Sequence, residues 1–428
     1  MNRLLFRGAR LLDPESGLDT CGDLLIEGDR IAAFGAHLSF EARDAETIGA
    51  EGLCLAPGLV DMRVQLREPG AEHMESIETG GQAAAAGGVT TMVALPNTDP
   101  PVDDVSVVEF LARRAREAKL AKVHTYAAAT KGLAGRDLTE MGLLAANGAL
   151  GFTDGVRAIA DALVMRRVLA YARTFDLLVV QHPEEPSLAR AGEVSESAIA
   201  TRLGLPAIPP AAEVIMIERD LRLVEITGGR YHVAHVSTAA GVEAIRRAKA
   251  RGLGVTCDTA PPYFALNEAA IGDYRTFAKL SPPLRSEGDR RAVVEGLRDG
   301  TIDAIASDHS PWDQDSKRLP FGSAAYGIVG LETLLPLSLE LYHNHHLGLL
   351  ELMRRLTLKP AQILGLPVGR LAPGAPADLV LFDPDLAWQI STDAFRSKSK
   401  NAPFDGRPVR GRVRRTIVDG RTIFQAPD

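Results

Sequence analysis

Several features are scarce in this sequence of 428 residues. Cysteine occurs only three times, at Cys21, Cys54 and Cys257 and in no CxxC spacing, which argues against a disulfide framework and fits a reducing cytoplasm. No uncharged apolar stretch reaches the roughly 18 residues that a membrane span needs. The first residues run directly into an apolar strand pattern and show no signal peptide. We therefore expect a cytoplasmic protein that does not cross a membrane.

An excess of positive charge is also lacking. The net charge is −7 and the pI is near 5.9, which argues against nucleic acid or an anionic membrane as the main partner. What is present is ordinary for a globular protein, with 46% hydrophobic and 24% charged residues. The length allows one large domain and a smaller one.

The two ends of the chain share one character. Each contains short alternating apolar segments bounded by turn residues, a pattern typical of β-strands, and neither contains a long helical pattern. The predicted strands span residues 4–12, 23–27, 31–35, 47–55, 377–382 and 413–424, the last with a turn at Asp419-Gly420. Because domain termini often lie together, we expect one small β domain built from residues 1–55 and 366–428.

The middle of the chain, residues 56–365, alternates apolar strands with helical patterns. Predicted strand and helix pairs include 90–95 with 105–119, 123–127 with 139–147, and 230–235 with 238–251, and further strands span 177–181, 253–258 and 304–307. This number of strand–helix units predicts an α/β fold, a (β/α)8 barrel. In such barrels the chemistry lies at the carboxyl ends of the strands, which directs attention to the polar residues found there.

One stretch, residues 57–70, reads Pro-Gly-Leu-Val-Asp-Met-Arg-Val-Gln-Leu-Arg-Glu-Pro-Gly. Its polar residues alternate with apolar ones, so it predicts a strand from which Arg63 and Gln65 project the same way. A strand with one buried and one polar face is typical of a barrel strand that opens onto a site.

This stretch resembles the first-strand signature of dihydroorotases, cyclic-amide hydrolases of the amidohydrolase superfamily, and the resemblance extends nearly end to end. It implies a (β/α)8 TIM barrel with a small β-sandwich domain. In that family both variable positions of the signature are histidine and bind the first of two metal ions. Here they are Arg63 and Gln65, so the metal site is degenerate at these two positions.

Three further residues match metal ligands of the family. His182 (in Gln-His-Pro-Glu) and His235 (in His-Val-Ser-Thr) each end a predicted strand, and the resemblance implies that they bind the second metal. Neutral imidazole is a good zinc donor, so together they are able to hold one ion. Asp154, in Phe-Thr-Asp-Gly, resembles the carboxylate that bridges the metals, although an Asp-Gly turn explains it equally well.

The strongest retained motif is Ile-Ala-Ser-Asp-His-Ser-Pro. By resemblance Asp308 ligates the first metal and acts as the general acid and base, and His309 helps to bind substrate; the structural alternative for Asp308 is a helix cap. Arg67 and Asn97 match positions that bind the substrate carboxylate, a task that suits the guanidinium fork. Ser281 departs from the family, which usually has asparagine there.

Arg63 changes the chemistry most. A guanidinium has no lone pair to offer a metal and keeps its charge. A fixed positive charge about 4 Å from a divalent cation costs roughly 8 kcal/mol at an effective dielectric of 20. We therefore expect the first metal position to be lost and hypothesise that Arg63 pairs with Asp154, Asp308 or both, since an unpartnered buried carboxylate is costly.

The sequence leaves three functions open. The first, implied by resemblance to metal-site-degenerate dihydroorotase-like proteins of pyrimidine biosynthesis, is a pseudoenzyme that acts as an oligomeric scaffold for aspartate carbamoyltransferase, without a cofactor. The second is an active hydrolase with one zinc, which interconverts carbamoyl aspartate and dihydroorotate with Asp308 as acid and base; Ser281 and Pro262-Tyr263 leave another cyclic amide or ureide open. The third is a dicarboxylate-binding protein that uses Arg67 and Asn97.

Overall fold

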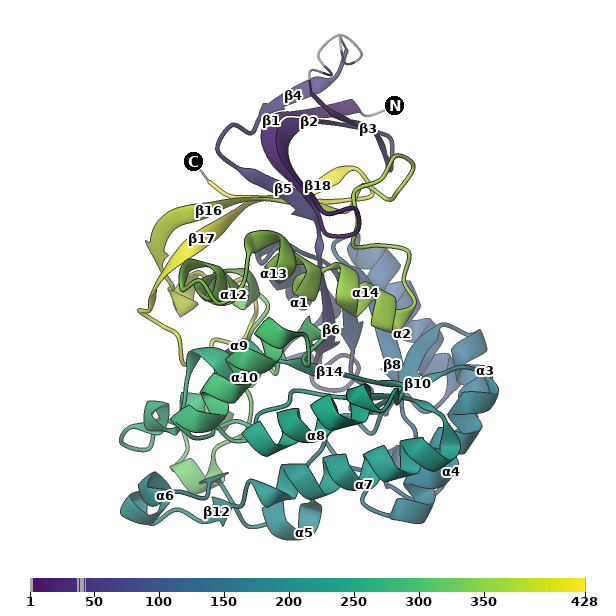
Figure 1. The fold of residues 1–428 in the computed structure, drawn as a ribbon, viewed down its shortest axis with the longest axis vertical. Coiled ribbons are helices and arrows are strands. Elements are labelled where there is room, and N and C mark those ends of the chain that lie inside the picture. The colour runs from purple at the N-terminus through teal and green to yellow at the C-terminus, as the bar shows by residue number, and fades with distance from the viewer. Residues whose placement is uncertain (1–2, 37, 39–41, 43, 428) are drawn as a thin grey trace.

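The structure, a computed structural model, describes residues 3–36, 38, 42 and 44–427. Strands from both ends of the chain form one eight-stranded sheet at the top of Figure 1. These strands are β1 (Arg3–Asp13), β2 (Leu18–Glu27), β3 (Arg30–Gly35), β4 (Glu46–Gly49), β5 (Cys54–Pro57), β16 (Leu379–Gln389), β17 (Pro408–Val418) and β18 (Arg421–Gln425). Strand β5 joins the halves, because it pairs with both β1 and β16.

One predicted strand of this domain is wrong. The stretch 47–55 is two strands, β4 and β5, which pair with different segments of β1. A turn at Glu51-Gly52 separates them, and Gly52 has a positive φ of 79°, a conformation that favours glycine. Apolar residues lie on both sides of this turn, which is why the pattern suggested a single strand.

The second eight-stranded sheet is parallel and forms the barrel. Its strands are β6 (Leu59–Val64), β7 (Val89–Ala94), β8 (Lys122–Ala127), β9 (Ala149–Phe152), β10 (Leu178–Gln181), β13 (Arg230–Val233), β14 (Val255–Thr259) and β15 (Ala304–Ile305). A parallel bridge between Val64 and His309 brings the segment after β15 back to β6, so the barrel is nearly closed. The predicted α/β fold, a (β/α)8 barrel with a small β-sandwich domain, is confirmed.

Helices surround the barrel (Figure 1). The longer ones are α1 (Ile77–Ala86), α2 (Val105–Ala118), α4 (Ala162–Thr174), α7 (Ala211–Thr227), α8 (Ala239–Ala250), α10 (Glu287–Asp299), α12 (Leu334–His343) and α13 (Leu349–Leu356). The shorter ones are α3 (Met141–Ala146), α5 (Pro186–Ala189), α6 (Ala198–Leu203), α9 (Pro261–Ala265), α11 (Gln314–Lys317) and α14 (Leu358–Leu364), and a two-stranded ribbon pairs β11 (Val194–Ser195) with β12 (Ala207–Ile208).

Helix α4 illustrates why these segments are helical. The Asp161 side chain caps its start by accepting from the backbone N–H groups of Leu163 and Val164. The buried face then consists of apolar residues at helical spacing: Val164, Met165, Val168, Leu169 and Ala172. Such faces pack against the outside of the strands, while Val60, Tyr126, Val180 and α14 residues belong to a separate core cluster.

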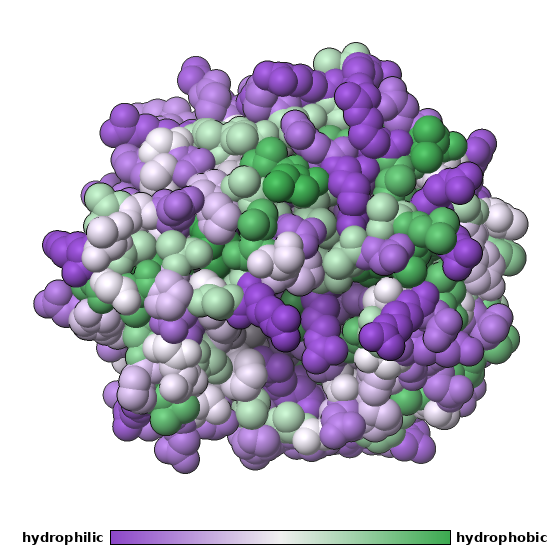
Figure 2. All heavy atoms as spheres, turned by 90° about the horizontal axis from the view of Figure 1, so that it is seen from below, coloured by the Kyte–Doolittle hydropathy of each residue, from purple (hydrophilic) through white to green (hydrophobic). Residues whose placement is uncertain are grey.

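The face seen in Figure 2 lies at the end of the molecule away from the β domain. It is mostly hydrophilic with scattered apolar groups and is hollowed near its centre. Within the part of the chain that the structure describes, no helix is long and apolar enough to cross a membrane.

Candidate active site

Arg63 is the second-to-last residue of β6 and forms a buried ion pair with Asp308. Its Nε donates to Asp308 Oδ1 at 2.8 Å, and its Nη2 donates to the carbonyl oxygen of Gly155 at 3.3 Å. Only 3% of the Arg63 side chain is exposed, and 14% of that of Asp308. The hypothesis that Arg63 pairs with one of the two acids is confirmed for Asp308.

The electrostatics of this pair are set by burial and by the guanidinium. Burial raises the pKa of Asp308, and the adjacent charge of Arg63 works against that rise. Within the described chain, Nη1 of Arg63 is buried and has no hydrogen-bond partner. The arrangement places a permanent cation where the resemblance puts the first metal.

Gln65 lies at the centre of a hydrogen-bond network. Its Oε1 accepts from Asn97 Nδ2 and its Nε2 donates to Ser310 Oγ, both at 2.9 Å. The network joins the end of β6 to the loops that follow β7 and β15. Both polar ends of this 6% exposed side chain are therefore engaged with protein groups.

Arg67 extends the network toward Trp312. Its Nε donates to the Pro311 carbonyl at 3.0 Å, its Nη2 donates to Ser310 Oγ at 3.3 Å, and its guanidinium lies 4.4 Å from the centroid of the Trp312 ring. Burial lowers the pKa of Arg67 to about 10, so it stays a cation at neutral pH. No described carboxylate forms an ion pair with it.

The predicted bridging acid, Asp154, is held by a loop. Its Oδ1 accepts from the backbone N–H of Thr130 at 2.9 Å, and its Oδ2 accepts from the Thr130 hydroxyl. Burial raises the pKa of this carboxyl. Both of its oxygens are thus occupied by Thr130.

His182 and His235, the two predicted second-metal ligands, lie together at the ends of β10 and β13. His182 Nδ1 and His235 Nε2 are 3.0 Å apart and share a hydrogen bond. Glu184 lies 3.6 Å from His182 Nε2. Burial, and then the charge of Arg63, lowers the pKa of His235 well below its usual range, which keeps this imidazole neutral.

His309 turns away from the other predicted residues. Its Nδ1 accepts from the Gly330 backbone N–H at 3.1 Å, and its Nε2 lies 3.4 Å from a carboxylate oxygen of Glu75. Both side chains of the His309–Glu75 pair are fully buried. Sequence reasoning did not find Glu75, which lies five residues beyond the stretch 57–70.

A cavity of about 340 Å³ opens above the Arg63–Asp308 pair. The structure brings five predicted residues to its wall: Arg63, Gln65, Arg67, Asn97 and Asp308. Its apolar side and rim include residues that sequence reasoning missed, among them Leu280, Ser310, Trp312 and Tyr326. The sequence could have indicated Ser310 and Trp312 as cavity residues, because they come just after Asp308-His309 in the chain.

These donors do not fit a two-metal centre. A catalytic zinc is normally held by three protein ligands and keeps a position for water. Among residues 3–36, 38, 42 and 44–427 there is no group of three or more His, Cys, Asp or Glu side chains that is placed to hold a metal ion. His182 and His235 bond to each other, Asp154 binds Thr130, Asp308 binds Arg63, and Glu184 approaches His182 to 3.6 Å.

The chain is similar to known families and, over its whole length, to known relatives. Residues 52–240 match the dihydro-orotase-like family model and residues 203–424 that of the amidohydrolase family. A dihydroorotase of Wolbachia sp. subsp. Drosophila simulans is 47% identical over 423 residues, covering 99% of this chain and 96% of the relative. A dihydroorotase of Syntrophotalea carbinolica is 45% identical over 426 residues, covering all of both chains.

Solved structures give the same assignment of fold. An L-hydantoinase (dihydropyrimidinase) from Arthrobacter aurescens superposes with a TM-score of 0.89 at 27% identity, covering 99% of this chain and 96% of that chain. A dihydropyrimidinase from Brevibacillus agri superposes with a TM-score of 0.86 at 24% identity, covering 99% and 95%. The chain belongs to the dihydroorotase family of the amidohydrolase superfamily.

Proposed function

We propose that this chain is a non-catalytic member of the dihydroorotase family and serves as a structural partner of aspartate carbamoyltransferase in pyrimidine biosynthesis. The observation that carries the proposal is the ion pair between Arg63 and Asp308. It puts a fixed cation where the resemblance places a metal. It also engages the carboxylate that would ligate that metal and transfer the proton.

Loss of the metal centre removes the nucleophile. Free water has a pKa of 15.7, and a bound metal lowers that value to about 7 in metal-dependent hydrolases. A lone arginine supplies charge but no open coordination position for water. Asp308 is paired with the guanidinium and has no metal beside it to stabilise a hydroxide ion. It is then a poor acceptor for a proton from water.

The partner in the proposal comes from the family resemblance. Polar side chains of the site bond to one another, and the whole barrel and β domain are present around it. If the site does not catalyse a reaction, the outer surface of the intact fold is the part of the chain that can serve a function. That surface is where a scaffold meets its partner.

A second candidate is a hydrolase with one zinc, favoured by the 3.0 Å contact between His182 and His235 and by the names of the relatives. A dicarboxylate-binding protein is favoured by Arg67, a largely buried cation beside the cavity. Neither candidate needs the Arg63–Asp308 pair, whereas the proposed function explains it.

The experiment is an assay of the purified, zinc-supplemented chain in both directions, with dihydroorotate and with carbamoyl aspartate. The Syntrophotalea carbinolica relative serves as the positive control. We expect no turnover above the uncatalysed rate and a complex with purified aspartate carbamoyltransferase in sedimentation velocity. Turnover would establish the hydrolase instead, and saturable binding of carbamoyl aspartate without turnover or complex formation would establish the binding protein.

A further inference from the structure

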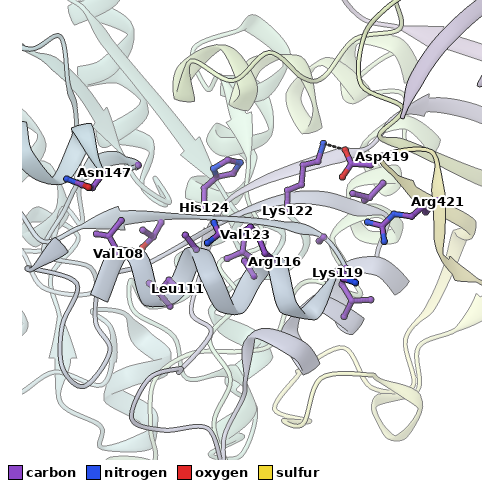
Figure 3. A pocket seen from close by; sticks show the side chains of 17 residues that line it. Val108, Leu111, Arg116, Lys119, Lys122, Val123, His124, Asn147, Asp419 and Arg421 are labelled. Carbon is purple, nitrogen blue, oxygen red and sulfur yellow. Dashed lines mark ion pairs between the residues drawn. The ribbon is translucent and has the colours of Figure 1, made fainter. Parts of the chain in front are cut away.

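A second concave surface lies on the outside of the barrel, beside the amino-terminal ends of the strands. It is a groove of about 450 Å³ along α2 and the start of β8, and the turn between β17 and β18 closes one end. Figure 3 shows α2 running beneath the strand that carries Lys122 and His124, with Arg421 near the Lys119 end of the helix. None of its lining residues belongs to the candidate active site.

The helix that precedes Asn147, α3, is short. Helix α3 has six residues, whereas its neighbours α2 and α4 have 14 and 13. A helix of six residues spans about 9 Å and covers little of the strands beneath it. Asn147 and Gly148, which follow α3 directly, line the groove.

One end of the groove carries positive charge. Arg116, Lys119 and Arg421 line it with exposed side chains, and within the described chain no carboxylate forms an ion pair with any of them. Lys122 is different, because Asp378 and Asp419 each approach its ammonium group to 2.7 Å. That cluster of one ammonium and two carboxylates has a net charge of −1. With the three unpaired cations, this end of the groove therefore keeps a net positive charge in a chain whose net charge is −7.

The floor and the other end are apolar. Val108 and Leu111 of α2 form part of the floor. Beyond Asn147 the surface continues onto Leu143 and Phe175, which are 56% and 52% exposed. Asn147 donates to the Leu143 carbonyl, and the Phe175 ring packs over Gly142, so Leu143 and Phe175 form an apolar ridge beside the Asn147 end of the groove.

We propose that this groove and ridge are the docking surface for an acidic, apolar-containing segment of a partner protein; this rests on the proposed scaffold function. Arginine and aromatic residues are enriched at protein interfaces, and unpaired cations favour a partner of opposite charge. From Val108 to Lys119 the helix rises about 16 Å, the span of roughly five extended residues. A segment with apolar side chains followed by two or three carboxylates matches this order of surfaces.

A second copy of the chain fits less well. A symmetric dimer brings the same patch of both molecules together. Among its lining residues the groove has one carboxylate, Asp419, and it is already paired with Lys122. A second copy of this patch therefore brings no free acid to Arg116, Lys119 and Arg421, which favours a different chain as the occupant.

The test uses the full-length chain and purified aspartate carbamoyltransferase in sedimentation velocity. The groove variant carries Arg116→Glu, Lys119→Glu and Arg421→Glu. The matched control carries Arg202→Glu, Arg275→Glu and Arg318→Glu, which make the same change in charge at exposed residues outside the groove. A second variant, Leu143→Ser with Phe175→Ser, removes the apolar ridge without changing charge.

The surface assignment predicts that wild-type and control chains form the complex, while the groove and ridge variants bind at least about tenfold more weakly. All four should show the same thermal unfolding, which separates docking from folding. Equal binding by the groove variant overturns the docking surface and leaves the scaffold proposal standing. Absence of any wild-type complex overturns both, and self-association that the groove variant abolishes identifies a second copy as the occupant and overturns the assignment.

Discussion

The guanidinium of Arg63 donates to the carboxylate of Asp308 across 2.8 Å, although the two residues are 245 positions apart in the chain. They come from β6 and from the loop after β15, the two edges at which the barrel closes. The pair therefore does two things. It gives a largely buried acid a partner of opposite charge, and it links the two edges of the barrel.

Removing one member of this pair should destabilise the fold. We expect Arg63→Met to lower the free energy of unfolding by about 3 kcal/mol at pH 8, because Asp308 is left as a buried unpaired charge. Asp308→Asn should also cost stability. In urea denaturation the double variant should lose less than the sum of the two single losses by about 1–3 kcal/mol. Losses that add to within about 0.5 kcal/mol would show that the pair is not coupled.

The Gln65 network should be a second source of stability. Gln65→Leu removes the bonds to Asn97 and Ser310 and leaves both partners unsatisfied, so we expect a loss of about 1–3 kcal/mol in the same assay. Gln65→Glu is the matched control, since a carboxylate accepts from the Asn97 amide and from the Ser310 hydroxyl. If both variants unfold like the wild type, the network contributes nothing measurable.

The burial of Asp61 predicts that the stability of the fold depends on pH. This carboxyl is fully buried, accepts from the backbone N–H groups of Ser307 and Arg63, and burial raises its pKa to about 7. Between about pH 4 and pH 7 the folded chain holds a proton here that the unfolded chain releases, so stability falls as the pH rises through this window, by at most about 1.4 kcal/mol per unit.

The check is the free energy of unfolding of Asp61→Asn across that window. The amide keeps an acceptor but cannot ionise, so the slope should be flatter than that of the wild type. An unchanged slope would assign the pH dependence to other groups.

His235 should be neutral in mildly acidic solution. Its pKa is well below the usual range because it is buried and close to Arg63 and His182. Nitrogen chemical shifts of the imidazole, assigned by loss of the signal in His235→Asn, should show no protonation between pH 7.5 and about 5.5. A midpoint at or above the ordinary value near 6.5 would contradict the arrangement.

The fold was predictable because its signals are local. Apolar alternation, helical spacing and the motif around Arg63 together indicate a barrel, and each is read within a few residues. The error at 47–55 has the opposite cause. The turn at Gly52 separates two strands that pair with different parts of β1. The residues of 47–55 alone do not indicate that pairing.

The sequence predicted several residues of the candidate site, but fewer of the contacts that they make. Charge alone indicated that Arg63 would find an acid, and Asp308 is that acid. The bond between His182 and His235, the capture of Asp154 by Thr130 and the burial of His309 against Glu75 all depend on loop positions. Such distances follow from the packed structure and have no signature in the sequence.

Zinc stoichiometry at saturation shows whether Arg63 excludes the first metal. The wild-type chain and Arg63→His/Gln65→His are equilibrated with excess zinc, freed of unbound metal and measured by mass spectrometry of the metal. A permanent cation at the first metal position predicts at most one zinc per wild-type chain, with a higher content in the double histidine variant. Two zinc ions bound per wild-type chain would contradict the account.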